Sequence, residues 1–420
     1  MSLHRSRYDG VPRIVQRKNQ SAADRGIAGR RAASPQWCSC NSECSRCYGI
    51  AMTPHRPLRV LITNLELFGR SGTTLYVRDL ALELQRQGHE PIVYTLHLGA
   101  ISQELRAANI PVVRWLWQIG RPPDIIHAHH CDPALDVLRY FPRTPAIYIC
   151  HDHQSQWDRV PLHPQIRRYF GVSELCIERV VGAGVPRENV ELIYNFVDTR
   201  RFKTREALAA TPCRALVFSN YARIASYLPA VQEACRRAGL PLDVVGSNTG
   251  QGETHPEALL HRYDLVFAKG KAAMEAMASG AAVILCDFGG LGPMVTVSEL
   301  PRLRPLNFGF QALVDPVTPE SVLQRIGQYD AEEARRVNLL LRRDVGLDDA
   351  VRHLVSLYRQ IVVSQGGEAD VGAYGGPRPL IARTTLYKIW FLLGVGVRLR
   401  LKQLPGVAAA LGAALARMRA

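Results

Sequence analysis

The sequence predicts an α/β fold made of two doubly wound parallel sheets, one in each half of the chain. Short apolar runs of strand length alternate with amphipathic stretches of helical length, a pattern typical of parallel β-α-β units. The alternation ends and restarts between residues 202 and 214, so we expect two similar halves of roughly 150 residues each. With 420 residues, 47% of them hydrophobic, the chain can bury two cores, and a fully disordered or fibrous protein is excluded.

The first half opens with the apolar run LRVLITN at 58–64, which predicts a strand buried on both faces. A glycine-containing turn at 67–74 and an amphipathic helix follow, and Gly88 ends the helix. The further strands predicted for this half lie at 89–96, 112–115, 125–128, 146–150 and 190–194.

The second half begins with the strand RALVFS at 214–219 and an alanine-rich helix at 228–239. A final amphipathic helix at 350–363 closes it, after strands at 242–245, 265–268 and 282–286. Both halves are therefore predicted to be Rossmann-like. Such halves bind ligands at the carboxyl ends of their strands, in the cleft between them.

The net charge of +15 comes from the two ends of the chain. Residues 1–56 contain ten basic and three acidic residues, and residues 371–420 contain eight basic and no acidic ones. The body at 57–370 therefore has 34 residues of each sign and no net charge. This distribution disfavours a nucleic-acid-binding body, which would have a basic surface of its own.

Residues 1–56 are polar and rich in Arg and Ser, with no apolar run of secretory length, so we expect a disordered basic tail and no signal peptide. Met52 directly precedes the first strand, and residues 1–51 could lie upstream of the true start. A zinc knuckle is the alternative for four cysteines spaced C-x-C-x3-C-x2-C, namely Cys38, Cys40, Cys44 and Cys47. The other six cysteines stand in apolar contexts and predict buried free thiols of a reducing compartment.

Residues 363–420 are predicted to form a linker followed by a basic amphipathic segment. Its apolar run at 389–397 is too short to cross a bilayer, which needs ~20 residues. We expect an interfacial helix on an anionic membrane surface, with Trp390 and Phe391 as anchors, and a peripheral position at the cytoplasmic face of the inner membrane. The alternative is an extra helix packed on the body.

Specific motifs follow one another along the body. In the second half, AMEAMASG at 273–280 and AAVILCDFGG at 281–290 combine a Glu-containing helix, a strand and a glycine pair. The first half contributes a glycine loop, two histidine motifs and a segment before the second half, which are LFGRSGTT at 67–74, DIIHAH at 124–129, CHDH at 150–153 and IYNFVDTRRF at 193–202. Their order and spacing over residues 57–362 resemble family-4 type (group 1) GT-B glycosyltransferases.

The resemblance implies a GT-B architecture with an interdomain cleft. Residues 57–205 would form the N-terminal, acceptor-side domain, and residues 206–362 the C-terminal domain that binds the nucleotide-sugar donor. The implied reaction is transfer of a sugar, as by a hexosyltransferase, to an acceptor hydroxyl with retention and without a metal or another cofactor. The basic C-terminal segment would suit a lipid-linked or glycan acceptor in cell-surface polysaccharide synthesis. No carboxylate pair suited to a glycosidase stands out.

The donor side is predicted around one helix. Glu275 is a suitable acceptor for the hydroxyls of a ribose, and Gly289 and Gly290 would let backbone amides approach phosphate. Lys269 and Lys271 would add positive charge at the start of the same helix, whose N-terminus itself favours anions. The alternatives are a carboxylate on the helix surface and lysines in a solvated loop.

The first half would supply the catalytic side chains. The resemblance implies that His151 and His129 act in the active site and that Gly69 and Gly72 form the acceptor and phosphate loop. A capped structural imidazole is the alternative for His151. His127 and His129 alternate along a strand and should face opposite sides, so only one can line the cleft.

Other polar residues nearby are given structural roles. Asn195 and Asp198 are expected to fix the interdomain turn. A metal cluster of the neighbouring histidines with His130, Cys131 and His153 is not expected, because GT-B enzymes work without a bound metal and no Asp-x-Asp motif is present.

The donor motif also departs from the family. Phe267 stands where family members have a second Glu, and SNYAR, with Arg223 as its only cation, replaces the usual Arg and Lys clamp on the diphosphate. These departures favour the alternative of a non-catalytic GT-B scaffold that binds a nucleotide or glycan in a glycan-assembly complex. An epimerase or phosphorylase with the same fold is the third hypothesis.

Overall fold

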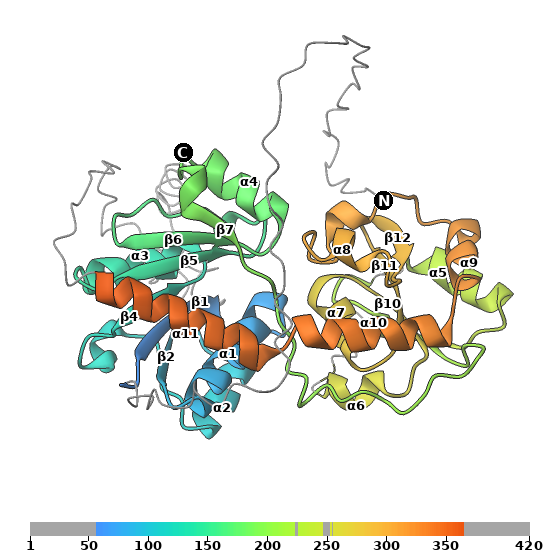
Figure 1. Cartoon of the computed structure of the whole chain (residues 1–420), viewed down its shortest axis with the longest axis horizontal. Coiled ribbons are helices and arrows are strands. Elements are labelled where there is room, and N and C mark those ends of the chain that lie inside the picture. The colour runs from blue at the N-terminus through green and yellow to red at the C-terminus, as the bar shows by residue number, and fades with distance from the viewer. Residues whose placement is uncertain (1–55, 223–225, 247–252, 254, 365–420) are drawn as a thin grey trace, which may run out of the picture. The chain divides into compact units, whose positions relative to one another are not determined.

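The computed structural model describes residues 56–222, 226–246, 253 and 255–364. The tail with its four cysteines and Met52 lies outside these residues, as do Arg223 and the basic amphipathic segment. The described part contains two sheets, with helices packed against each of them (Figure 1).

The first sheet has seven parallel strands in the order β3-β2-β1-β4-β5-β6-β7. Strand β1 lies inside this sheet and is buried from Val60 to Leu65, because neighbouring strands and helices cover both of its faces. The elements of this half are β1 (Arg59–Glu66), α1 (Gly72–Arg86), β2 (Glu90–His97), α2 (Ala100–Ala107), β3 (Val112–Val113), η1 (Leu116–Ile119), β4 (Ile125–Ala128), α3 (Cys131–Tyr140), β5 (Ala146–Cys150), η2 (Gln156–Asp158), β6 (Ile166–Gly171), α4 (Glu174–Gly182), η3 (Arg187–Asn189) and β7 (Val190–Leu192).

The second sheet has five strands in the order β12-β11-β10-β8-β9, and all neighbours are parallel except β11 and β12. Together the two sheets confirm the predicted two-sheet α/β architecture. The elements of this half are β8 (Ala215–Phe218), α5 (Leu228–Arg237), β9 (Leu242–Val245), α6 (Pro256–Leu260), β10 (Leu265–Ala268), α7 (Gly270–Ala278), β11 (Ala282–Asp287), β12 (Gly290–Met294), α8 (Leu300–Leu303), η5 (Phe310–Ala312), α9 (Pro319–Ile326) and α10 (Ala331–Asp344).

The last described helix, α11 (Leu347–Ser364), returns to the first half and packs beside α1 (Figure 1). Its buried side chains, among them Leu354 and Tyr358, belong to the same core as β1 and β5. Backbone hydrogen bonds hold the crossing point: Val197 N donates to Val345 O over 2.8 Å, and Leu347 N donates to Val197 O over 3.1 Å. The chain therefore passes between the halves twice, once in each direction.

Four strands differ from the sequence prediction. The strand expected at 112–115 stops at Val113, where a 3-10 turn follows it, and the strand expected at 190–194 stops at Leu192. Strand β6 was not predicted, because Arg167 and Arg168 interrupt its apolar run. Strand β12 was not predicted either, since GLGPM reads as a turn; Pro is tolerated in this antiparallel edge strand.

The six described cysteines are all free thiols, as predicted. Five of them are buried, but Cys213 is exposed because it lies in the loop before β8.

Candidate active site

A cleft of about 610 Å³ lies where the carboxyl ends of both sets of strands meet. The cleft is lined by residues at or just after the ends of seven strands. For β1, β4, β5, β8, β9, β10 and β11 these are, in order, Glu66, His130, His151, Ser219, Gly246, Lys269 and Asp287. Parallel strands leave unpaired backbone groups and loops at this edge, so polar side chains gather there. The position of the cleft agrees with the sequence prediction.

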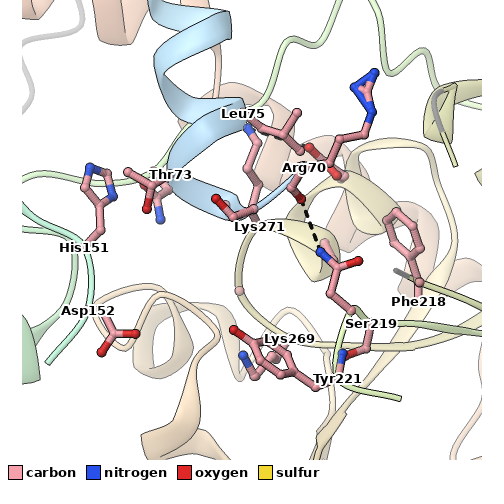
Figure 2. A pocket seen from close by; sticks show the side chains of 18 of the residues that line it. Arg70, Thr73, Leu75, His151, Asp152, Phe218, Ser219, Tyr221, Lys269 and Lys271 are labelled. Carbon is pink, nitrogen blue, oxygen red and sulfur yellow. Dashed lines mark hydrogen bonds and ion pairs between the residues drawn. The ribbon is translucent and has the colours of Figure 1, made fainter. Parts of the chain in front are cut away.

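The start of α1 forms one side of the cleft. Ser71 caps this helix, its hydroxyl accepting from the Thr74 amide over 3.3 Å, so Gly72 and Thr73 present the first turn to the cavity. Thr73 lines the same cavity as Lys271, and the Asn220 side-chain amide donates a hydrogen bond of 3.2 Å to the Arg70 carbonyl (Figure 2). This bond joins the two halves at the cleft.

His151 follows β5 and lines the cleft opposite the second half (Figure 2). Its Nε2 lies 2.9 Å from Nδ1 of His129, which is completely buried and does not line the cavity. The ring of Tyr76 packs on both imidazoles, with centroid distances of 4.8 Å to His151 and 5.3 Å to His129. Of the two predicted catalytic histidines, one therefore faces the cavity and the other lies behind it.

The row of histidines continues inward to the last helix. The ring of His127 lies 4.6 Å from that of His129, and its Nδ1 is hydrogen-bonded to the hydroxyl of Tyr358 on α11. The expectation that His127 and His129 face opposite sides was wrong, because residues two apart along a strand point to the same face of the sheet, and the two rings lie together.

Burial keeps these imidazoles neutral. It lowers the pKa of His127 to about 3 and that of His129 and His151 well below the ordinary value. A neutral imidazole has one N–H and one lone pair, and the Nε2 of His151 is already hydrogen-bonded to His129. Its remaining nitrogen is available for one hydrogen bond to a ligand.

Glu275 lies in α7 and lines the cleft, but it is almost fully buried in a charge network. Lys271 Nζ lies 3.7 Å from Glu275 Oε1, 3.1 Å from Asp79 Oδ2 and 3.1 Å from the Phe196 carbonyl. Arg78 completes the network with a contact of 2.5 Å to Asp79. The charge of Lys271 is thus balanced within the protein, across the boundary between α1 and α7.

The carboxylates of this network respond oppositely to their surroundings. Burial raises the pKa of Glu275, and Lys271 only partly offsets this effect. Burial also acts to raise the pKa of Asp79, but the charges of Lys271 and Arg78 outweigh it and hold the pKa below its ordinary value. Asp79 is therefore the principal counterion of Lys271.

Lys269 has a different environment. Its ammonium lies 3.2 Å from Asp287 Oδ2 and faces the rings of Phe310 and Tyr221, at 4.3 and 5.0 Å from their centroids. It lines the cleft just before the first turn of α7 (Figure 2). Together with the amides of that turn, it makes this end of α7 the electropositive wall of the cavity.

The predicted glycines have different surroundings. Gly72 lines the cleft and has nothing within 4 Å of where a Cβ would lie, whereas Gly69 has the same free space but does not line the cavity. Gly289 and Gly290 line a separate hollow. Gly290 has a φ of +140°, and a Cβ there would lie 2.9 Å from the carbonyl oxygens of Leu313 and Asp315, so close backbone packing already requires this glycine.

Asn195 also lines the cleft, while Asp198 accepts a hydrogen bond from the Arg200 amide in the segment between the halves.

Several further residues in and around the cavity were not predicted. Burial raises the pKa of Asp158, on the cleft wall beside Trp157, to about 8. Asp287 directly follows the apolar run of β11 and was open to prediction by its position. Arg78 and Asp79 lie on the buried face of α1, and nothing in the sequence distinguishes them from surface charges.

Residues 70–201 match the sequence profile described as Glycosyltransferase Family 4. The predicted resemblance is confirmed. HepE of Anabaena, solved with UDP and glucose, is a similar structure: the identity is 15%, 72% of this chain and 100% of that chain are covered, and the TM-score is 0.52. A glycosyltransferase of Rickettsia africae is 13% identical over 73% of this chain and 99% of that chain, with a TM-score of 0.54. No curated protein matches the sequence.

The solved structures identify the two-sheet architecture as a GT-B fold, and the profile match relates residues 70–201 to glycosyltransferases. Among the described residues, no group of three or more His, Cys, Asp and Glu side chains is arranged to hold a metal ion. The helices of the described part likewise include none with the length and hydropathy of a membrane span.

Proposed function

We propose that the protein transfers a sugar from a nucleotide-sugar to an acceptor hydroxyl bound in this cleft. The supporting observation is that one cleft brings together Lys269 and Glu275 of the second half with His151 and Asp152 of the first. The solved structure of HepE with UDP and glucose, which has the same fold, favours a nucleotide-sugar as donor.

The diphosphate of the donor would bind at the N-terminus of α7. Backbone amides of the first turn and the Lys269 ammonium would stabilise the negative charge that grows as the nucleotide leaves. Lys269 would then exchange its contact with Asp287 for one with phosphate. Lys271 would act indirectly, by neutralising Glu275 and Asp79 so that the ribose hydroxyls meet a carboxylate held in place.

The acceptor hydroxyl would bind on the His151 side. In the proposed reaction the bond between the anomeric carbon and the diphosphate oxygen breaks, and a bond from that carbon to the acceptor oxygen forms. A deeply lowered pKa makes His151 a weak base. We therefore assign the acceptor proton to the departing diphosphate, which suits transfer with retention, and assign to His151 the orientation of the sugar or acceptor. No metal or other cofactor is part of this proposal.

The pathway and location belong to the same proposal. A lipid-linked or glycan acceptor in cell-surface polysaccharide synthesis would place the enzyme at the cytoplasmic face of a membrane. The predicted contact of residues 363–420 with an anionic leaflet would be tested by liposome flotation of the full chain against a chain that ends at Gly376.

The test of the transferase function is release of nucleoside diphosphate from a panel of nucleotide-sugars. Glu275→Ala should lower turnover at least about tenfold, because the donor loses a positioned contact. Glu275→Gln keeps the side-chain volume and controls for loss of folding, and Glu320→Ala, at an exposed residue of α9, is the matched control. Turnover unchanged in Glu275→Ala would contradict the assignment of the site.

A non-catalytic scaffold is the second candidate. Phe267, in place of the family's second Glu, is completely buried in β10 and offers no polar group to a donor sugar. Nucleotide binding by calorimetry without turnover for any donor would favour this alternative. Release of an isomerised or phosphorolysed sugar from donor alone would instead indicate an epimerase or phosphorylase.

A further inference from the structure

Two histidines that follow neighbouring strands meet behind the wall of the cleft. His129, just after β4, is completely buried, and its Nδ1 lies 2.9 Å from Nε2 of His151, which follows β5 and lines the cavity (Figure 2). Of the two, only His151 can therefore meet a ligand, and His129 acts on the cleft through this contact.

The backbone holds His129 firmly in this place. Its amide donates to the Thr63 hydroxyl over 2.9 Å, and the same hydroxyl donates to the His129 carbonyl over 2.8 Å. His130, the next residue, has a φ of +56°, which a residue with a side chain rarely adopts, and its Nδ1 accepts a hydrogen bond of 3.1 Å from the Leu65 amide. Strained backbone that its surroundings hold in this way is typical of functional sites.

Two neighbouring rings pack against the His129 side chain. The centroid of the His127 ring lies 4.6 Å from that of His129, and the centroid of the Tyr76 ring lies 5.3 Å from it. His127 is in turn hydrogen-bonded through Nδ1 to the hydroxyl of Tyr358 on α11. All four side chains are buried, so close packing restricts rotation of the His129 ring.

The position of the proton on His129 follows from its partners. Burial lowers the pKa of His129 and of His151 well below the ordinary value, so each imidazole is neutral, with one N–H and one lone pair. Nε2 of His129 is buried and has no hydrogen-bond partner among the described residues. A proton there would leave a buried N–H without an acceptor, which proteins avoid more strictly than an unused lone pair. The proton of His129 is therefore assigned to Nδ1.

This assignment determines what His151 offers to a ligand. If His129 donates from Nδ1, His151 accepts at Nε2 and carries its own proton on Nδ1. The ligand then meets an N–H donor, and the matching atom is an oxygen with a free lone pair, as in a sugar hydroxyl or a phosphate. The opposite tautomer would offer a lone pair and would accept the hydrogen of a hydroxyl instead.

We propose that His129 is a positioning residue, which fixes the ring and the tautomer of His151 so that His151 donates a hydrogen bond to an oxygen of the bound sugar or phosphate. His127 and Tyr358 support His129 from the side of α11. This inference rests on the proposed function and adds to it the direction of the His151 hydrogen bond. It also accounts for a weak base at this position, since a hydrogen-bond donor does not have to take up a proton.

Two substitutions of His129 separate positioning from packing. In His129→Asn the side-chain amide can donate from nearly the place of Nδ1, whereas in His129→Leu an apolar group fills the space without a donor. The kcat for release of nucleoside diphosphate should fall about a hundredfold in His129→Leu and less than about tenfold in His129→Asn, with KM nearly unchanged in both. His353→Asn and His353→Leu, at an exposed histidine of α11, are the matched controls and should turn over normally.

A role in packing alone predicts the reverse order, because Asn leaves a cavity in the core that Leu fills. A higher kcat in His129→Leu than in His129→Asn would therefore overturn the proposal. Denaturant unfolding of both variants confirms that the compared proteins are folded.

A second measurement does not depend on turnover. Nitrogen-15 NMR of the full chain labelled at histidine distinguishes protonated ring nitrogens from those with a lone pair, and single histidine variants assign the signals. His129 and His151 should both be protonated at Nδ1, and a proton on Nε2 of either would refute the proposal. If the unmodified chain turns over no donor, the transferase proposal fails, whereas the tautomer of His151 is still decided by these signals.

Discussion

Lys269 and Lys271 are two residues apart, yet their surroundings give them different tasks. Lys269 borders the cavity with one carboxylate and two rings as neighbours, whereas Lys271 holds together a buried network of Asp79, Glu275 and the Phe196 carbonyl. A charge that is compensated inside the protein has little left for a ligand. The sequence motif alone treats the two lysines as equivalent, and the packing separates them.

The two lysines should therefore respond differently to removal. Lys269→Ala should weaken binding of a nucleoside diphosphate about tenfold and leave the free energy of unfolding nearly unchanged. Lys271→Ala should lower the free energy of unfolding by about 3 kcal/mol, because it leaves Asp79 and Glu275 buried without their cation. Calorimetric titration and denaturant unfolding of both variants measure this. The reverse pattern would assign the phosphate contact to Lys271.

A second prediction at this scale concerns His127, which is buried and neutral. Its pKa of about 3 lies below the value in the unfolded chain, so between these values the unfolded state binds a proton and the folded state does not. Stability is therefore lost as the pH falls from 7 to 5, by about 2 kcal/mol for this one residue. Urea unfolding at both pH values should show a smaller difference for His127→Gln. An unchanged difference would show that His127 is protonated in the folded protein.

At the scale of elements, the glycines illustrate how backbone and ligand requirements differ. Gly290→Ala should lower the free energy of unfolding by about 3 kcal/mol, because its φ of +140° and its contacts with two carbonyl oxygens leave no room for a methyl group. Gly72→Ala should fold normally, since a methyl group meets nothing at the start of α1, and should weaken nucleotide binding if phosphate lies against that turn. Thermal unfolding and calorimetry of the pair distinguish these effects.

The elements also show what the sequence can and cannot predict. Strands β5 and β11 contain unbroken apolar runs, Ala146–Cys150 and Ala282–Cys286, because both their faces are covered, and this signal is visible in the sequence. Strand β6 carries two arginines and β12 two glycines and a proline, so their pairing depends on neighbours far away in the chain. In the site, residues at strand ends such as His151 and Lys269 could be predicted from position. Asp79 could not, because its partner is 192 residues away on another helix.

At the scale of the whole molecule, the return of α11 to the first half makes the fold discontinuous in sequence. Residues 347–362 were grouped by sequence with the second half, because the pattern shows an amphipathic helix but not its partner. The buried face of that helix fills the core around β1 and β5, and Tyr358 meets the histidine row that ends at His151. The first half is therefore complete only when the chain has passed through the second.

This discontinuity predicts how the chain tolerates shortening. A protein that ends at Val345 lacks the side chains of α11 that close the first core, and burial of each large aliphatic or aromatic group contributes roughly 2 kcal/mol. Such a protein should expose the first core, bind a hydrophobic dye and precipitate, because the lost burial is comparable with the stability of a whole domain. A protein that ends at Ser364 keeps α11 and should retain both cores, as judged by near-ultraviolet circular dichroism and protease resistance. Normal folding without α11 would mean that the first sheet is stable alone and that the helix serves only to position His127 through Tyr358.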